Sequence, residues 1–527
     1  MRSPALDLVL HRGVVLTPAA STASAVGIAA GRVALVGDQD AVLRAAGAAT
    51  RRINLGGRTV VAGFNDAHAH IWKIGQLLTT MLDLRRVVSI DELIRRVAER
   101  AGRLTGGAWL LGRGYNEAAL AERRPPTRRD LDRAAPHVPV ALTRTCGHIC
   151  VANTLALELA EIGAGTAAPT GGVIERDDGG QPNGVLHETA IGLIKRVMPS
   201  PPIEEYEAMI AAALRHQLSL GITSSADCGV TPEILAAYRA LDARGALSSR
   251  VNVMPLRRVD GVPEPLPLPE QFVSERLRVD TAKFLTDGGL SGATAALSVN
   301  YRHTPQKGVL RFDHDELAGL CRETHRAGWR IAAHAIGDVA IDEVLGIYES
   351  LGPHPHGRAH RIEHFGLPDA RQIERASRLG VIAAPQAIFI PALGRNFRTC
   401  LPDSFLPRTY PIRAMLDAGL TVALSSDAPV VEDDNPLAGM RAAIVRGDGD
   451  GLPIAPEQAI TASEALYAYT MGGAIASGDE LNRGSIEPDK WADLAVLSAN
   501  PLAVDAESLP DISVDMTLVG GRVAFER

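Results

Sequence analysis

The chain has 527 residues, which is too long for one ordinary hydrophobic core, so two or more domains are expected. Apolar residues make up 46% and charged residues 22%, a profile typical of soluble globular proteins. The net charge of −7 comes without a basic tract, and no apolar run reaches the roughly 20 residues of a membrane helix. We therefore expect neither a nucleic acid nor a membrane as a partner.

The cysteines and the first residues favour a cytoplasmic location. Five scattered cysteines, an odd number, do not make a disulfide framework. Asp7 and His11 interrupt any signal-peptide core. Cys146 and Cys150 are four residues apart without the partner pair of a zinc knuckle, so they are interpreted as structural. We expect a cytosolic protein with reduced thiols.

Both ends of the chain have the pattern of short strands. Residues 1–57 contain apolar segments separated by glycine, such as LDLVLHRGVVLTP and AVGIAAGRVALVGD. Residues 476–527 show the same pattern in WADLAVLSANPL and DMTLVGGRVAFER. These patterns predict strands joined by tight turns. We expect one β-sandwich built from both chain termini.

The middle of the chain alternates between apolar runs and helical segments. The runs lie at 58–64, 221–227, 250–256, 280–288, 330–338, 360–366, 381–386 and 421–429. Strand–helix alternation predicts a parallel sheet, and eight units predict an α/β fold with a closed (β/α)₈ TIM barrel. The first barrel strand and its motif are assigned to residues 58–70, and the rest of the barrel to residues 221–475.

The gap at residues 71–220 is too long for one crossover. It contains SIDELIRRVAERAG, which opens with a Ser89-x-x-Glu92 capping box and predicts a helix. It also contains VPVALTRT, which predicts a strand. We therefore expect an inserted α/β region after the first barrel strand.

Two histidines end the first barrel run, in GFNDAHAH. Residues two apart on a strand point to the same side, so His68 and His70 would face one point. Two neutral imidazoles in this arrangement can bind one metal ion. The alternative is a pair of polar loop residues, and the motif alone leaves both open.

Other polar side chains also stand at the tips of predicted barrel strands, where barrel active sites are built. These are Lys283, His334, His364 and Asp427. Together with His68 and His70 they have the number and kind of groups that bind zinc. The nearby His354 and His356 are interpreted as loop residues.

The motifs GFNDAHAH, AKFLTDGGLSGATAAL, RIAAHAIGDVAID, RIEHFG, VALSSDAPV and NRGSIEPDKWADLAVLSANPL resemble the amidohydrolase superfamily, and most of all its N-substituted formamide deformylase-like branch. The resemblance covers nearly the whole chain. It implies that the metal ligands are His68, His70, Lys283, His334, His364 and Asp427. It also implies one or two divalent ions, with zinc expected.

The expected ligands have distinct chemical roles. A divalent ion activates water and polarises a carbonyl. In related barrels a lysine such as Lys283 takes up CO₂, and the resulting N6-carboxylated side chain bridges two ions; the alternative is a plain ion pair with Asp287. Asp427 is either a ligand only or also the carrier of the proton, and His334 is the other candidate catalytic residue.

Candidate substrate-binding residues lie in the predicted insertion. The resemblance makes His148 a candidate, although Cys146-Gly147-His148 stands where related proteins usually have Asp-Gly-His. Related sequences often have tryptophans where this chain has Arg113 and Tyr115. These differences favour a changed substrate specificity.

The leading interpretation is a metal-dependent amidohydrolase that cleaves a C–N bond of a small molecule: an amide, an N-formyl or N-acyl amine, or a cyclic amide. The alternative enzyme is an aminohydrolase (deaminase) acting on a heterocycle. It is less favoured because such enzymes usually place a Glu soon after the His334 position and lack a lysine like Lys283. A non-catalytic scaffold would have lost metal ligands that this chain retains. Whether the protein forms a homodimer is left open by the sequence.

Overall fold

The computed structural model describes residues 5–18, 23–104, 107–145, 147, 149–169, 172–259, 262 and 264–527. The chain divides into two compact units. The main unit contains residues 1–71, 213–257 and 267–527, and the inserted unit contains residues 72–212 and 258–266. Within the described ranges, no helix combines the length and the apolar character that crossing a membrane requires.

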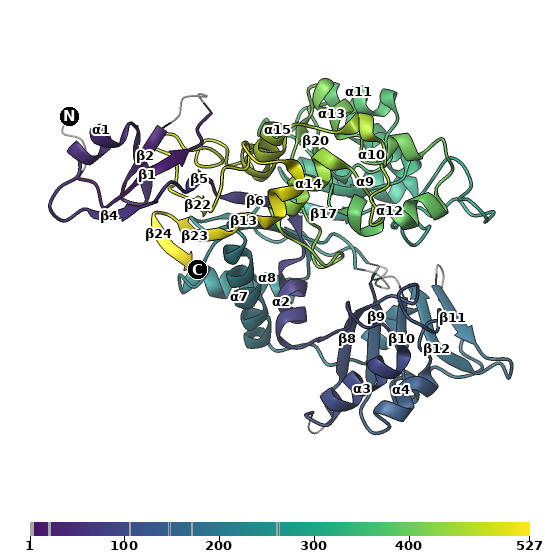
Figure 1. The fold of residues 1–527 in the computed structure, drawn as a ribbon. Coiled ribbons are helices and arrows are strands. Elements are labelled where there is room, and N and C mark those ends of the chain that lie inside the picture. The colour runs from purple at the N-terminus through teal and green to yellow at the C-terminus, as the bar shows by residue number, and fades with distance from the viewer. Residues whose placement is uncertain are drawn as a thin grey trace. The chain divides into compact units, whose positions relative to one another are not determined.

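Strands from both ends of the chain share one eight-stranded sheet, in which the purple N-terminal strands lie beside the yellow C-terminal ones (Figure 1). Its order is β24-β23-β22-β5-β1-β2-β3, and β4 pairs with β1. The antiparallel pairing of β22 with β5 brings strands from both ends of the chain into this sheet, although β5 lies in the run predicted to be the first barrel strand. That the terminal strands form a β-sandwich stays a prediction. The strands are β1 Leu8–Val15, β2 Ala23–Ala29, β3 Arg32–Gly37, β4 Arg51–Asn54, β5 Thr59–Ala62, β22 Leu494–Leu497, β23 Val514–Val519 and β24 Arg522–Glu526.

The rest of the main unit is built on two five-stranded sheets, ordered β15-β16-β14-β13-β6 and β17-β18-β19-β20-β21. Their ladders are parallel except where β15 meets β16. The strands are β6 Phe64–Ala69, β13 Ile222–Val230, β14 Arg250–Pro255, β15 Phe272–Val273, β16 Leu277–Val279, β17 Thr281–Leu285, β18 Arg330–Ala335, β19 Arg361–His364, β20 Ile382–Ala384 and β21 Thr421–Val422.

Helices connect these strands, which gives the α/β alternation expected from the sequence. They include α8 Pro232–Ala243, α9 His314–Arg326, α10 Asp338–Leu351, α11 Ala370–Arg378, α12 Phe389–Cys400, α13 Ile412–Asp417, α14 Pro436–Val445, α15 Ala462–Tyr467 and α16 Gly473–Ser477. Among the strands, β13, β14 and β17 to β21 lie in seven of the eight predicted runs, in order, whereas the first run, residues 58–64, is divided between β5 and β6. The ladders, however, form two sheets and do not by themselves make one closed barrel.

Single contacts link these two sheets at two places. A parallel bridge joins Leu256, which follows the inner strand β14, to Lys283 on the edge strand β17. Near the edge strands β6 and β21, the Asp427 N–H donates to the His68 carbonyl and the His70 N–H to the Ala428 carbonyl, each at 2.8 Å. Closure of the barrel therefore stays a prediction. In a closed barrel, the two sheets would join at these two places.

The run predicted as the first barrel strand, residues 58–64, is divided at Gly63. Before the glycine, β5 belongs to the terminal sheet, and after it β6 pairs with β13. A Cβ atom at Gly63 would lie 2.2 Å from Oγ1 of Thr223 on β13. The glycine thus allows the close approach at which the chain passes from one sheet to the other.

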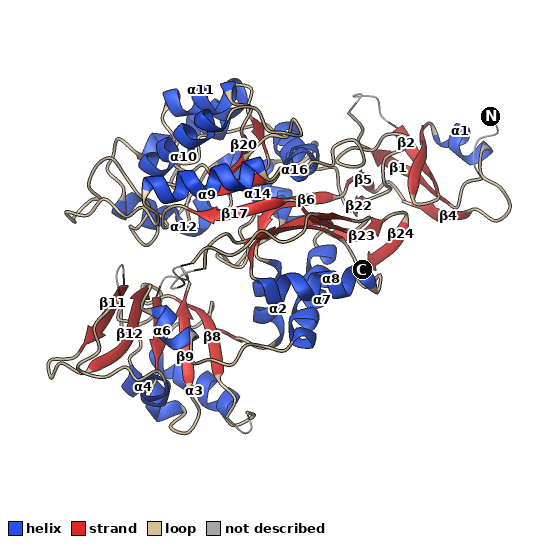
Figure 2. Cartoon of the chain, turned by 180° about the vertical axis from the view of Figure 1, so that it is seen from behind, coloured by secondary structure: helices blue, strands red, loops and turns tan. Residues whose placement is uncertain are grey.

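The inserted unit has its own six-stranded sheet, ordered β11-β12-β10-β9-β8-β7, with helices packed on it (Figure 2). Its strands are β7 Leu82–Asp83, β8 Leu110–Tyr115, β9 Val140–Arg144, β10 Ile149–Ala152, β11 Gly172–Arg176 and β12 Pro182–Glu188. Its helices are α3 Ile90–Ala101, α4 Arg128–Ala134, α5 Thr154–Leu159 and α6 Ile191–Lys195, with α2 Ile71–Thr79 and α7 Ile203–Ser219 at its ends.

The helix predicted in SIDELIRRVAERAG is α3, and one of the two hydrogen bonds of the predicted capping box is present at its start. The Ser89 hydroxyl accepts the Glu92 N–H at 3.1 Å, as the capping box requires. The Glu92 carboxylate accepts the N–H of Val88 instead of that of Ser89. Leu93 and Val97, on the buried face of α3, join the core of the inserted unit.

Candidate metal centre

The histidines and the aspartate predicted at strand ends lie together in the main unit. Nε2 of His68 is 3.4 Å and Nε2 of His70 is 3.2 Å from Oδ1 of Asp427. The His364 ring lies 4.8 Å from the His68 ring and 4.4 Å from the His334 ring, centroid to centroid. The strand ends thus bring five of the predicted ligands into one cluster.

Three members of this cluster can reach a common ion. His68, His364 and Asp427 each offer a ligand atom, and these atoms all lie within 4.8 Å of one another. All three side chains are buried. Imidazole nitrogens with a carboxylate form a donor set that suits zinc and similar divalent ions.

The protonation of the cluster also fits a cation. Burial, with Lys283 nearby, lowers the pKa of His334 to about 3, and burial with His334 nearby lowers that of His364 to about 3. Burial alone would raise the pKa of Asp427, but His68 and the other histidines outweigh it and hold that pKa well below its usual range. Neutral rings and an ionised carboxylate are the forms that bind metal.

Side chains behind the rings hold two of them in place. The Nδ1 atom of His68 is 2.5 Å from Oε2 of Glu363, and Nδ1 of His364 is 2.6 Å from Oε1 of Gln386. Because each Nδ1–H donates backwards, the Nε2 lone pair of each ring is left for a ligand. The sequence reasoning missed both partners, although Glu363 lies in the RIEH motif and Gln386 ends the predicted strand VIAAPQ.

Asp66, also missed, ties β6 to the segment after β21. Its carboxylate accepts the Ser426 N–H at 3.0 Å and the His68 N–H at 3.3 Å. Burial raises the pKa of Asp66 to about 7. Its signal in the sequence is its place in GFNDAHAH, two residues before His68. The bond from Ser426 joins the strand that carries His68 to the segment that carries Asp427.

Lys283 is buried, with 1% of its side chain exposed. Its Nζ atom has no hydrogen-bond partner among the described residues. The expected alternative, an ion pair with Asp287, is not found there; Asp287 instead accepts the N–H groups of Ala296, Ile336 and Gly337. A buried ammonium without a partner is costly, so the residues present fit a chemical change at Nζ.

His334 is turned partly away from the three-residue group. Its Nε2 atom lies 3.1 Å from the Gly288 carbonyl and 3.1 Å from Oδ1 of Asp287. Burial raises the pKa of Asp287 to about 7. His334 therefore stands at the edge of the cluster, between His364 and Asp287.

The predicted substrate residues lie in a different part of the chain. Arg113 and Tyr115 are on β8 of the inserted unit, and Tyr115 is fully buried in that unit's core. His148 lies outside the described residues, as does Cys146. The role of these residues in substrate binding stays a prediction.

A second group of histidines lies at the other end of β18 and β19. Nδ1 of His325 is 3.0 Å from Nε2 of His360, whose Nδ1 accepts the Ile331 N–H. His354, in the loop before β19, accepts the His356 N–H at its own Nδ1. A ring that accepts at Nδ1 carries its proton on Nε2, so His354 and His360 act as hydrogen-bonding residues, in agreement with the loop interpretation of His354 and His356.

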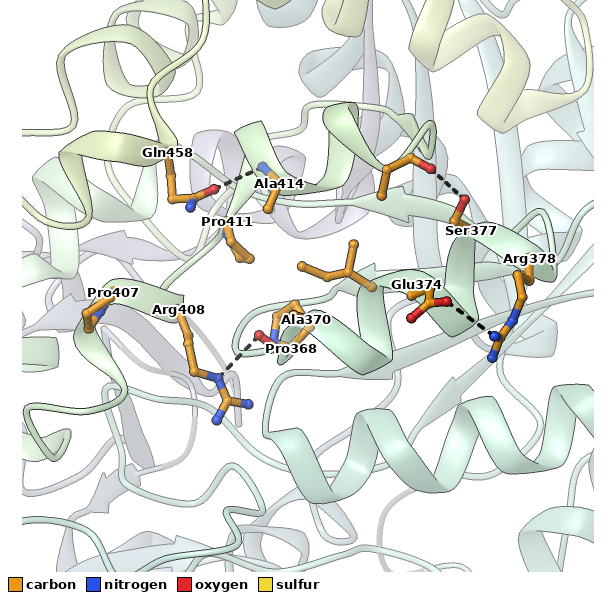
Figure 3. A pocket seen from close by; sticks show the side chains of 12 residues that line it. Pro368, Ala370, Glu374, Ser377, Arg378, Pro407, Arg408, Pro411, Ala414 and Gln458 are labelled. Carbon is orange, nitrogen blue, oxygen red and sulfur yellow. Dashed lines mark hydrogen bonds and ion pairs between the residues drawn. The ribbon is translucent and has the colours of Figure 1, made fainter.

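A cavity of about 430 Å³ lies on the main unit beside α11, α13 and η1 (Leu406–Arg408) (Figure 3). Pro368, Ile373, Pro411 and Ala414 supply much of its apolar lining. None of its lining residues belongs to the histidine cluster. The cavity is therefore not part of the candidate metal centre.

Comparison with known proteins finds relatives that match nearly the whole chain. The chain is 31% identical over 546 residues to an N-substituted formamide deformylase of Arthrobacter pascens, covering 99% of this chain and 98% of the relative. It is 29% identical over 538 residues to the protein LONG AFTER FAR-RED 3 of Arabidopsis thaliana, covering 98% and 91%.

A solved structure and a family model point the same way. The crystal structure of an uncharacterized metal-dependent hydrolase from Pyrococcus horikoshii OT3 matches with a TM-score of 0.79 and 28% identity, over 95% of this chain and 99% of that one. The model described as "Amidohydrolase family" matches residues 51–525. The chain belongs to the amidohydrolase family.

Proposed function

We propose that this protein is a metal-dependent hydrolase that cleaves the C–N bond of a small amide, an N-formyl or N-acyl amine, or a cyclic amide. The observation that carries the proposal is the buried group of His68, His364 and Asp427, whose ligand atoms can reach one ion. The likeness to an N-substituted formamide deformylase supports the choice of bond. The proposal includes closure of the eight parallel strands into a barrel around this group.

The same proposal assigns the ion and its ligands. His68, His70, His334, His364 and Asp427 would hold zinc or a similar divalent ion, with room for one or two ions. When bound, such an ion lowers the pKa of water toward about 7 and polarises the substrate carbonyl.

The residues of the chain move the proton and orient the substrate. Asp427, ionised and in contact with His68 and His70, accepts the proton of the attacking water and passes it to the leaving nitrogen. His334 is the second proton-handling group. We assign substrate binding to His148, Tyr115 and Arg113.

Lys283 completes the site if its amine reacts with CO₂. The ammonium first loses a proton, the neutral nitrogen attacks the carbon of CO₂, a C–N bond forms while one C–O π bond breaks, and a second proton leaves, so that a buried cation becomes an anion with the release of two protons. The support is the absence of a hydrogen-bond partner for Nζ in the described chain. An anionic oxygen ligand suits a site that holds divalent ions.

One experiment tests the function directly. Purified protein is reconstituted with zinc, manganese or cobalt, its metal content is measured, and a panel of formanilides, N-acyl amino acids, hydantoins and amino-heterocycles is assayed. We expect hydrolysis within the first three classes that disappears after chelation and returns with metal. Release of ammonia from the amino-heterocycles alone would favour a deaminase. Metal content well below one equivalent, with no uptake on reconstitution, would exclude the proposed enzyme.

A further inference from the structure

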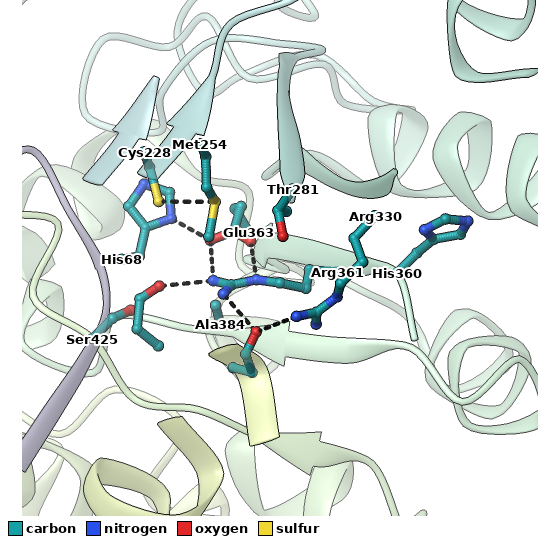
Figure 4. Close-up of polar contacts among 12 residues, drawn as sticks. His68, Cys228, Met254, Thr281, Arg330, His360, Arg361, Glu363, Ala384 and Ser425 are labelled. Atoms are coloured by element: carbon teal, nitrogen blue, oxygen red, sulfur yellow. Dashed lines mark hydrogen bonds and ion pairs between the residues drawn. The ribbon is translucent and has the colours of Figure 1, made fainter. Parts of the chain in front are cut away.

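Arg361 is fully buried in the main unit and lies on β19, three residues before His364. Its guanidinium donates two hydrogen bonds to the carboxylate of Glu363, from Nε to Oε1 at 2.7 Å and from one terminal nitrogen to Oε2 at 2.9 Å. The same oxygen, Oε2, accepts from Nδ1 of His68. Figure 4 shows Arg361 and His68 both directed at the carboxylate of Glu363, His68 from the left and Arg361 from below.

Arg361 also holds two other segments by their backbones. It donates to the Ala67 carbonyl at 2.7 Å, next to His68 on β6, and to the Ala476 carbonyl of α16 at 3.1 Å. One side chain thus contacts the strand that carries His68, the acid that holds its ring, and a helix near the C-terminal end. The planar guanidinium can make these bonds together because its five N–H groups form a fixed fork.

The strand geometry explains why this residue acts through Glu363. Arg361 and Glu363 are two apart on β19, so they point to the same side of the sheet. The carboxylate is therefore held between a cation on its own strand and the His68 ring on β6. With its Nδ1–H donated to this fixed acceptor, His68 can present only Nε2 to Asp427 and to an ion.

We infer that Arg361 is a positioning residue for the metal centre: it fixes Glu363, and Glu363 fixes the tautomer and the orientation of His68. This inference rests on the proposed function, since it assigns a role in metal binding. Among the described residues, the hydrogen bonds of Arg361 go to Glu363, Ala67 and Ala476, and none goes to a predicted ligand atom. Its effect should therefore appear in metal affinity.

Arg330 provides a matched control within the same interior. It is also an arginine with almost no exposed surface, and it donates to the same Ala476 carbonyl at 2.9 Å and to the Ala359 carbonyl at 3.0 Å. No described contact joins it to Glu363. A general loss of buried hydrogen bonds would affect Arg330→Lys and Arg361→Lys alike, whereas a positioning role would affect only the second.

The test measures zinc affinity by competition with a chelator for the full chain, with far-UV circular dichroism as the check on folding. We expect Arg361→Lys to bind zinc about 10- to 100-fold more weakly, as partners of ligating histidines typically do when changed. Arg330→Lys should bind close to the wild-type value. Equal losses in the two variants, or wild-type affinity in Arg361→Lys, would overturn the inference.

A second comparison separates action through Glu363 from any other route. Glu363→Gln should weaken zinc binding by itself, and Arg361→Lys/Glu363→Gln should be no weaker than Glu363→Gln, because the two residues act in series. If Arg361→Lys does not fold, the double variant Arg361→Met/Glu363→Gln is compared with Glu363→Gln instead. This double variant leaves no uncompensated charge in the interior. Losses that multiply would contradict the inference while leaving the proposed function intact. A wild-type protein that binds no metal would exclude both.

Discussion

His364 and Asp427 have backbones in the left-handed region, with φ of 68° and 54°. Few residues other than glycine adopt this conformation, which costs free energy and tends to occur at functional sites. At His364 it ends β19 immediately after Glu363. The turn allows two consecutive side chains, which a regular strand would point to opposite faces, to serve the same centre. The direction in which these two side chains point is therefore set partly by the conformation of the backbone.

The role of Asp427 can be tested with the closest possible replacement. Asparagine keeps the shape and one oxygen but cannot accept the proton, so Asp427→Asn should retain fold and metal and lose at least about 100-fold in kcat. The loss should appear in kcat more than in KM, because the proton moves only on the way to the transition state. Steady-state kinetics with parallel metal analysis measure both. Near-normal kcat with full metal would transfer the proton-handling role to another group such as His334.

His68 should be required for metal itself. His68→Ala removes one ligand of the three that can share an ion, so the purified variant should contain a small fraction of the wild-type metal. His356→Ala is the control, because His356 is an exposed loop histidine outside the cluster. Elemental analysis of both proteins measures the difference. The same metal content in both variants would mean that the His-x-His motif is not a binding site.

Lys283 should be needed for activity because, in its N6-carboxylated form, it would be an anionic ligand of the metal. Lys283→Ala should be inactive, and short carboxylic acids added with metal should restore part of the rate, because they can occupy the space of the carboxylated side chain. The same acids added to the wild type should not raise its rate. Inactivity without any rescue, together with a mass spectrum or density showing a plain amine in the wild type, would exclude the carboxylated form.

At the scale of elements, the passage from β5 to β6 depends on Gly63. The chain leaves the terminal sheet there and enters the strand that ends in His68 and His70. Thr223 on β13 is buried and would meet an added Cβ at 2.2 Å, so its side chain cannot easily move away. The position of the metal motif is thus coupled to a close contact between two strands.

Gly63→Ala should destabilise the protein by about 1–3 kcal/mol, the usual range for overpacking a core. Gly37→Ala is the control, since an added Cβ there meets nothing within 4 Å, and its stability should stay within about 0.5 kcal/mol of the wild type. Denaturant unfolding followed by fluorescence measures both. Equal stability of the two variants would show that β13 can shift to admit the methyl group.

At the scale of the whole molecule, the candidate metal centre belongs to one of the two units. Its proposed ligands come from β6, β17, β18, β19 and the segment after β21, all within the main unit. An ion bound there would connect strands from the two five-stranded sheets. It would stabilise the folded form by RT ln(1 + [metal]/Kd), about 4 kcal/mol at a thousandfold excess over Kd.

Removing the metal should therefore loosen the main unit selectively. Hydrogen exchange measured by mass spectrometry should accelerate in peptides that cover β6, β18 and β19 after chelation, and return to the original rates with zinc. Peptides that cover β8, β9 and β12 of the inserted unit serve as the internal control and should change little. Acceleration confined to the inserted unit would contradict a metal centre built by the main unit.

Much of this protein follows from local patterns in the sequence. Alternating apolar runs and helical segments predicted the α/β order, and glycine-separated runs at both ends predicted strands that are present as β1 to β3 and as β22 to β24. The candidate ligands were found because parallel strands place their ends on one side of a sheet, so that a polar residue at each strand tip is a strong signal. These features depend on periodicity and on residue type, which a sequence displays directly.

Other features required the tertiary structure. Glu363 and Gln386 accept hydrogen bonds from imidazoles that are 295 and 22 residues away in the sequence. The hydrogen bond from Arg361 to the Ala67 carbonyl joins residues that are 294 apart. The absence of a hydrogen-bond partner for Lys283 among the residues that the structure describes, and the division at Gly63, depend on which groups approach in space. The sequence determined which residues could bind metal, because that is a property of each side chain and its place on a strand. Only packing decided which acid holds which imidazole, because hydrogen bonds between distant strands have no local pattern.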